Sequence, residues 1–185
     1  MAKAQAPIPF TYEDYKSLPE SETKRYELLG GELVMVPAPS WFHQSISGAL
    51  FRFLDSFVRA RKLGEVRFAP LDVVLSETDV VQPDLLYLSR ERLRLVREGV
   101  VQGAPDLVVE IFSPATAQRD RTLKRTLYAR SGVNECWLVD PEAQSIEVLT
   151  LGTRGYKRAG LYTRDQVLKS PLLAGLTISL VEVFT

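Results

Sequence analysis

Two acidic residues lie in strand-like segments that are otherwise strongly apolar. Asp84 lies within residues 80–88, and Glu110 lies at the end of the apolar run that begins at residue 107. Segments of this composition are normally buried, and a buried carboxylate costs several kcal/mol unless a cation, a metal ion or good hydrogen bonds compensate it. The two acids are therefore candidates for binding a metal ion.

Each acid also has a structural interpretation. Asp84 follows Pro83 and could cap a turn at the end of a strand. A purely structural role is harder to argue for Glu110, which lies in the most apolar run of the chain. Asp106 could compete for the metal, but four residues along a strand span roughly 13 Å. We therefore expect Asp106 to face a strand terminus instead.

The composition is that of one globular domain. The chain has 185 residues, 45% of them hydrophobic, which suffices for one core and is short for two. Its 23 basic residues balance its 23 acidic ones, so nucleic-acid binding would need a local basic face. The single cysteine, Cys136, predicts a reducing compartment. Without an apolar signal segment or membrane span, we expect a cytoplasmic protein with no membrane partner.

Hydrophobic periodicity predicts the elements that would position the acids. Gly30-Gly31 between two apolar segments predicts a β-hairpin over residues 25–36. Apolar residues at three- and four-residue spacing predict a helix from residue 40 to about residue 62. The later segments are expected to be strands over 65–75, 80–88 and 106–112, a short basic helix over 90–97, a helix over 116–131, a strand over 137–139 and edge strands over 145–181.

This order predicts an α/β fold with a mixed sheet. From residue 40 it reads helix, three strands, helix and strand, and residues 106–140 form a βαβ unit. We expect a single domain over residues 1–185, with a core at about 40–141, the N-terminal hairpin at 25–36 and C-terminal strands at 145–181.

The predicted αβββαβ core resembles the PD-(D/E)XK nuclease superfamily, in which an Asp and a Glu from adjacent strands hold a divalent metal beside the scissile phosphate. Asp84 follows Pro83, and Glu110 stands 26 positions later. Phe112 occupies the position where the superfamily usually has its lysine. One variant of the superfamily carries that lysine on the next helix, and by this resemblance Lys124 is the candidate.

The chain is more closely similar to the Uma-type putative restriction endonuclease family. The similarity lies in short motifs that share an order: Tyr26-Glu27-Leu28, Gly31-Glu32-Leu33, His43, Gln82-Pro83-Asp84-Leu85, residues 104–111 with Ser113-Pro114, Asp120, Lys124, Tyr128, Gly132-Val133 and residues 137–141. It implies a restriction-endonuclease-like fold with one catalytic site formed by Glu27, His43, Asp84, Glu110 and Lys124.

The resemblance implies hydrolysis of phosphodiester bonds in DNA, with Mg²⁺ or Mn²⁺ as the cofactor. Asp84, Glu110 and the backbone carbonyl of Ile111 would supply the hard oxygen ligands that such an ion prefers. Lys124 would orient the attacking water or stabilise charge on the phosphate. The accessory groups would be Glu27 and His43. Because nuclease-fold proteins that cut both strands often act as dimers, we also expect a homodimer.

Three of these residues also have purely structural interpretations. His43 could be a packed histidine at a helix start, bonded to a backbone carbonyl. Lys124 stands four residues after Asp120, so the two could form a surface ion pair. Glu27 could lie on the solvent-exposed face of the hairpin. The arginines of residues 90–97 are typical of a solvated face, with phosphate contact as the alternative.

Phe112 in place of the usual lysine favours a second hypothesis, a catalytically inactive nuclease-fold module that binds DNA or a protein. A third is a scaffold that self-associates through the C-terminal strands. The sequence lacks the residues that other catalytic schemes require. The chain has one histidine, no glycine-rich phosphate loop and no Gly-x-Ser-x-Gly segment.

Overall fold

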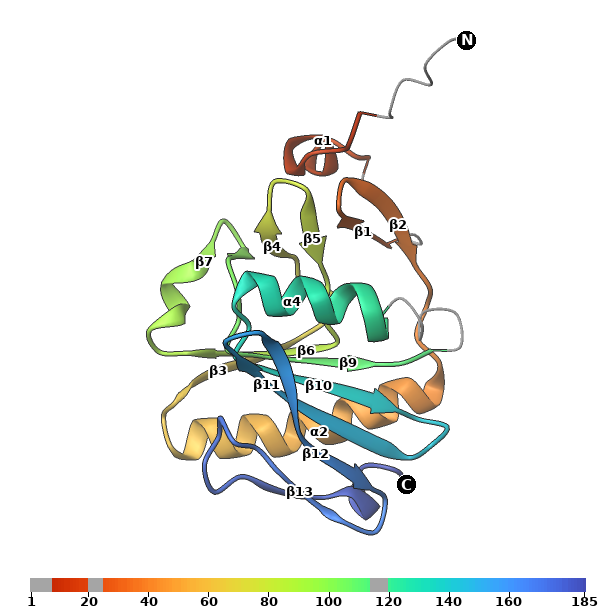
Figure 1. Cartoon of the computed structure of the whole chain (residues 1–185), viewed down its shortest axis with the longest axis vertical. Coiled ribbons are helices and arrows are strands. Elements are labelled where there is room, and N and C mark those ends of the chain that lie inside the picture. Colours follow the sequence, from red (N-terminus) through yellow and green to blue (C-terminus); the bar gives the residue numbers. More distant parts are fainter. Residues whose placement is uncertain (1–7, 20–24, 114–119) are drawn as a thin grey trace.

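The computed structural model of the chain describes residues 8–19, 25–113 and 120–185. Within them the strands form two six-stranded sheets and one two-stranded sheet (Figure 1). The central sheet has the order β12 (Gly155–Thr163), β11 (Ser145–Gly152), β10 (Glu135–Asp140), β9 (Leu107–Ile111), β6 (Leu85–Ser89) and β3 (Gly64–Phe68). The N-terminal sheet has the order β2 (Glu32–Val36), β1 (Arg25–Leu29), β5 (Asp79–Val81), β4 (Val73–Ser76), β8 (Val100–Gln102) and β7 (Val96–Arg97). The small sheet pairs β13 (Val167–Lys169) with β14 (Thr177–Ser179).

The helical elements within the described residues are few. They are α1 (Tyr12–Lys16), α2 (Trp41–Ala60), the 3₁₀ turn η1 (Arg92–Leu95), the π-helical turn η2 (Asp120–Lys124), α4 (Arg125–Ser131) and the 3₁₀ turn η3 (Leu180–Glu182). The beginning of the helix predicted over residues 116–131 lies outside the described residues.

The predicted αβββαβ core is confirmed and consists of α2, β3, β6, β9, α4 and β10. Strands β3, β6 and β9 are antiparallel neighbours, whereas β9 and β10 are parallel and are connected through α4. The predicted hairpin is also confirmed, since β1 pairs with β2 across Gly30 and Gly31. Both glycines have positive φ (60° and 81°), the conformation that this two-residue turn requires.

The prediction of continuous strands over residues 65–75 and 80–88 was wrong. Pro70 follows β3, and Pro83 separates β5 from β6. Proline has no N–H to donate to a strand partner, so pairing stops there and the chain changes sheet. The β4–β5 hairpin therefore belongs to the N-terminal sheet, and Asp84 lies at the crossover, directly before β6. The basic helix predicted over 90–97 is only the turn η1, followed by β7.

Two hydrophobic clusters cover opposite faces of the central sheet. One contains α2, the C-terminal segment and alternate strand residues such as Val109 and Ile111. The other contains α4, part of the N-terminal sheet and the intervening residues, such as Val108 and Leu138. Because side chains alternate along a strand, Glu110 points toward the face that α4 and the N-terminal sheet cover.

Candidate active site

The register of β6 and β9 brings Asp84 and Glu110 together. Leu85 pairs with Val109 in this antiparallel ladder, so one further step sets Asp84 opposite Glu110. The ladder ends there, because the Asp84 Oδ2 atom accepts a hydrogen bond from the Ile111 backbone N–H at 2.7 Å. The two carboxylates have different partners, since Asp84 contacts His43 of α2 and Glu110 contacts Lys124 and Tyr128 on the α4 side of the sheet. Both acids line one cleft of about 1300 Å³.

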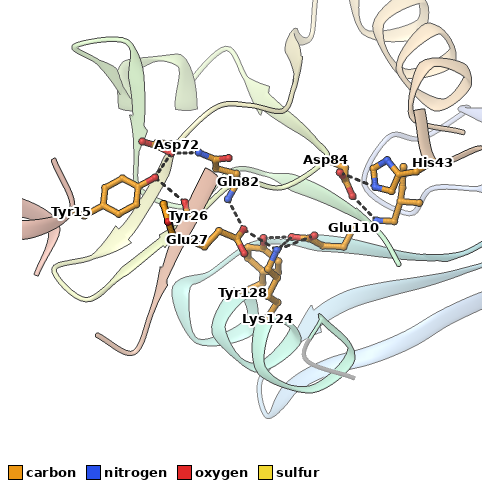
Figure 2. A network of polar contacts seen from close by, with 11 residues as sticks. Tyr15, Tyr26, Glu27, His43, Asp72, Gln82, Asp84, Glu110, Lys124 and Tyr128 are labelled. Atoms are coloured by element: carbon orange, nitrogen blue, oxygen red, sulfur yellow. Dashed lines mark hydrogen bonds and ion pairs between the residues drawn. The ribbon is translucent and has the colours of Figure 1, made fainter. Parts of the chain in front are cut away.

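Glu110 is held by two side chains from the helix that follows it. The Lys124 Nζ atom lies 3.2 Å from both Glu110 carboxylate oxygens, and the Tyr128 hydroxyl donates to Oε1 at 2.5 Å (Figure 2). Burial raises the pKa of the Tyr128 hydroxyl well above its ordinary value of 10.0, and the Glu110 carboxylate raises it further. The hydroxyl therefore remains protonated at neutral pH and keeps donating to Glu110.

Lys124 also joins the two sheets electrostatically. Its Nζ atom lies 2.8 Å from Glu27 Oε1 on β1, and the Gln82 backbone N–H donates to the same oxygen at 2.8 Å. Glu27, Glu110 and Lys124 expose only 1%, 3% and 5% of their surfaces. Among the described residues, this one ammonium group thus contacts two buried carboxylates.

His43 approaches Asp84 from the first turn of α2. Its Nε2 atom lies 3.2 Å from Asp84 Oδ1. The Ser40 hydroxyl caps the helix by accepting a hydrogen bond from the His43 backbone N–H at 3.2 Å. This bond fixes the position of the His43 backbone. The other ring nitrogen, Nδ1, is buried and has no hydrogen-bond partner within the described residues. A buried polar atom of this kind is suited to bonding water or a ligand.

A second group of polar contacts positions Gln82, whose backbone N–H binds Glu27. The Gln82 side chain donates to Asp72 Oδ1 at 2.8 Å, and the Tyr15 hydroxyl lies 3.1 Å from the same oxygen. The Tyr15 hydroxyl also lies 3.0 Å from the Tyr26 carbonyl oxygen (Figure 2). Burial raises the Tyr15 pKa, with the Asp72 carboxylate as the next cause. These contacts connect α1 and β1 to Gln82 and so position the backbone that binds Glu27.

The structure thus brings all five predicted side chains to one cleft. Glu27, His43, Asp84, Glu110 and Lys124 line it together with Ile111. Their catalytic roles remain predictions.

The purely structural interpretations of Glu27 and Lys124 are wrong. Glu27 is buried, so it does not lie on a wet face of the hairpin, and Lys124 is bonded to buried carboxylates, not held at the surface. Asp106 does lie at a strand terminus as expected, where it accepts from the Ser89 N–H at 2.7 Å. Arg92 lies 3.3 Å from Asp106 and donates to the Ala104 and Pro105 carbonyls, which is a structural arrangement.

Two residues that carry the family similarity, Gln82 and Tyr128, contact the site although the sequence did not predict them as site residues. Tyr128 stands four residues after Lys124, and that spacing on one helix could have indicated a shared face. The Gln82 backbone binds Glu27 only because the chain crosses between sheets at this point, and no sequence pattern shows that. The apolar wall of the cleft was also missed; it includes Phe42, Phe51 and Phe68.

The donor chemistry of the cleft fits a hard divalent cation. Asp84 and Glu110 supply carboxylate oxygens, each of which can accept more than one bond. Among the described residues, no three His, Cys, Asp or Glu side chains gather as a complete metal site. An ion here would therefore keep several waters, which is the usual behaviour of Mg²⁺ and differs from that of zinc.

Comparisons with known proteins identify the family and the fold of the chain. A family model described as Uma2, putative restriction endonuclease, matches residues 12–181. A putative nuclease belonging to DUF820 from Anabaena variabilis has a similar crystal structure, with a TM-score of 0.80 and 22% sequence identity over 95% of this chain and 98% of that one. That likeness shows a shared fold. No curated protein matches significantly. The helices of the described residues include none that is long and apolar enough to cross a membrane.

Proposed function

The chain belongs to the Uma2 family of putative restriction endonucleases, and from this premise we propose that it is a metal-dependent endonuclease that hydrolyses phosphodiester bonds in DNA. The observation that carries the proposal is the single cleft that Asp84 and Glu110 both line, with a buried lysine beside Glu110. Carboxylates from adjacent strands and a nearby amine are the groups that phosphate hydrolysis of this type requires.

Asp84, Glu110 and the Ile111 carbonyl are the proposed ligands of Mg²⁺ or Mn²⁺. When bound, the ion would make a water easier to deprotonate and would neutralise charge that grows on the phosphate oxygens. The Ile111 N–H and His43 hold the two Asp84 oxygens, so this carboxylate is oriented before any ligand arrives. Tyr128 holds Glu110 in the same way.

In this proposal Lys124 replaces the usual superfamily lysine, whose position is occupied here by Phe112. Phe112 is buried in the hydrophobic cluster on the α4 side, so it supplies no charge. Lys124 brings an ammonium group to Glu110 from the following helix. In the proposed mechanism this group stabilises negative charge on the phosphate and orients the attacking water, while Glu27 fixes the ammonium from the opposite side.

One observation favours a second candidate function, a catalytically inactive module that binds DNA or a protein. Lys124 is already bonded to two carboxylates, and a buried ion-pair network of this kind can serve the fold alone. Metal titration separates the two candidates. An enzyme should be stabilised against heat by Mg²⁺ or Mn²⁺ and should lose this response on Asp84→Asn, whereas an inactive module should show no response.

The direct test is cleavage of plasmid, single-stranded and branched DNA in Mn²⁺ or Mg²⁺. We expect cleavage by the wild type, none in EDTA and none by Glu110→Gln. Glu65→Gln is the matched control, because Glu65 lies on β3 of the same sheet with its side chain 46% exposed and outside the cleft. Cleavage that persists in Glu110→Gln would refute the assignment of the site.

We further propose that the protein acts in the cytoplasm as a homodimer, the state that its resemblance to dimeric nuclease-fold proteins implies. Light scattering at micromolar concentration should give twice the chain mass of 20.8 kDa. A monomer in the presence of DNA and metal would contradict the dimer but not the single-strand chemistry.

A further inference from the structure

We infer that the α2 side of the cleft is a subsite for the base of an unpaired nucleotide, so that the substrate is single-stranded or locally unpaired DNA and not closed duplex. The inference rests on the proposed nuclease function, because that function places the scissile phosphate at Asp84 and Glu110. It names the class of DNA that the same cleft accepts.

Gly48 provides the first observation. It lies in the interior of α2 and lines the cleft, together with His43, Ser47 and Phe51 from the same helix. A Cβ atom added at Gly48 would meet no atom within 4 Å. Glycine in a helix interior is less stable than alanine, and neither φ nor packing explains it here. The missing side chain leaves the helix surface open toward the cleft, as the close approach of a flat ligand requires.

The second observation is an exposed aromatic ring next to Asp84. Phe68 is 57% exposed, although its ring packs edge-to-face on Phe51 with the centroids 5.0 Å apart and the planes at 84°. Phe68 pairs with Leu85, and the adjacent Ala69 N–H donates to the Asp84 carbonyl at 3.0 Å. A base that stacks on Phe68 would therefore belong to a nucleotide close to the proposed metal ligands.

Charge and size distinguish an unpaired strand from duplex. Among the described residues, the charged side chains that line the cleft are mostly acidic: Glu27, Asp84, Glu110, Asp140 and Glu142 against Arg25 and Lys124. Duplex recognition depends on basic residues along two phosphate backbones, which the described part of the lining does not offer. Aromatic stacking serves unpaired bases of any sequence. The cleft of about 1300 Å³ also exceeds the roughly 300–1,000 Å³ of an ordinary small-molecule pocket, so it has room for a short strand.

The test is fluorescence anisotropy with a labelled oligothymidine and a labelled duplex of the same length, both in Ca²⁺ and at one salt concentration. The wild type should bind the single strand at least about tenfold more tightly. Phe68→Ala should weaken single-strand binding by about 5- to 150-fold, the range for loss of one stacked base. Gly48→Leu should weaken it by at least about tenfold by filling the open surface.

Gly48→Ala separates function from folding. Because alanine favours a helix, this variant should melt about 2–4 °C above the wild type, yet it should bind the single strand less well. Leu161→Ala is the control, since Leu161 is 51% exposed on β12 and lies outside the cleft. It should leave binding unchanged.

Three results would overturn the inference. They are equal affinity for single strand and duplex, wild-type affinity of both Gly48→Leu and Phe68→Ala, and failure of the wild type to bind the oligonucleotide. Cleavage is scored separately. Loss of binding in the two cleft variants without any cleavage by the wild type would refute the nuclease and leave the base subsite, whereas cleavage indifferent to these variants would refute the subsite alone.

Discussion

Replacing Lys124 by methionine should strongly destabilise the protein in the absence of metal. Methionine has a similar length and no charge, so the substitution removes the ammonium group and leaves Glu27 and Glu110 buried without it. Breaking a buried ion pair by removing one partner costs about 3–5 kcal/mol. For a chain of this length each kcal/mol lowers the melting temperature by about 2–4 °C, so Lys124→Met should melt about 6–20 °C below the wild type.

Divalent metal should reverse part of this loss. A cation that binds only the folded protein adds about 2.7 kcal/mol when its concentration is a hundred times its Kd. The Glu110 carboxylate, released from Lys124, should bind Mg²⁺ or Mn²⁺ more strongly than it does in the wild type. The metal-induced rise in melting temperature should therefore be larger in Lys124→Met than in the wild type, although DNA cleavage stays low because the amine is gone.

The assay is thermal unfolding followed by circular dichroism in EDTA and in increasing Mg²⁺ or Mn²⁺. Lys16→Met is the matched control, because Lys16 forms an ion pair with Glu13 at 2.7 Å, much like that of Lys124 with Glu27, but on the surface. Exposed pairs contribute little, so this control should melt near the wild type. A Lys124→Met protein that melts within about 2 °C of the wild type in EDTA would refute the reasoning, as would a metal response no larger than that of the wild type.

Three further perturbations test separate parts of the account. Tyr128→Phe removes only the hydroxyl that donates to Glu110, and we expect roughly 10- to 100-fold weaker Mn²⁺ binding by calorimetry, the usual effect of losing a group that orients a metal ligand; unchanged affinity would show that Tyr128 serves packing alone. Glu135 is buried and accepts from Trp137, Ser170 and the Leu172 N–H; burial raises its pKa above 4.5 despite these bonds. A raised folded-state pKa gives stability that is present at low pH and lost as pH rises through that pKa, so in urea titrations the wild type should lose stability relative to Glu135→Gln as pH increases from 4.5; a pH-independent difference would contradict the shift. Arg92→Ala should lower stability by roughly 1–3 kcal/mol for each carbonyl left unsatisfied, without weakening oligonucleotide binding, and a selective loss of binding would restore the phosphate-contact hypothesis.

The sequence predicts the elements whose patterns are local. The apolar spacing of α2 and the Gly30-Gly31 turn are each contained in one segment, and both elements form where expected. Glu110 was identifiable because a charged residue in an apolar strand is conspicuous whatever its partners are. These features depend on residues near one another in the chain.

The remaining features depend on residues that are distant in the chain. Strands β4, β5, β7 and β8 have two to four residues each, too few for a clear alternation, and they are stabilised by partners such as Leu28 opposite Val80. The contact between Lys124 and Glu27 likewise exists only after both sheets have formed. Pro83 cannot donate to a strand partner, but the sequence does not show that the chain changes sheets there and leaves Asp84 at the crossover.

Mn²⁺ binding measured by electron paramagnetic resonance tests most directly whether Asp84 and Glu110 share one metal ion. We predict one tightly bound Mn²⁺ per wild-type chain, and loss of this ion in both Asp84→Asn and Glu110→Gln while Glu65→Gln retains it. Binding of the ion with wild-type affinity by either cleft variant would contradict the account.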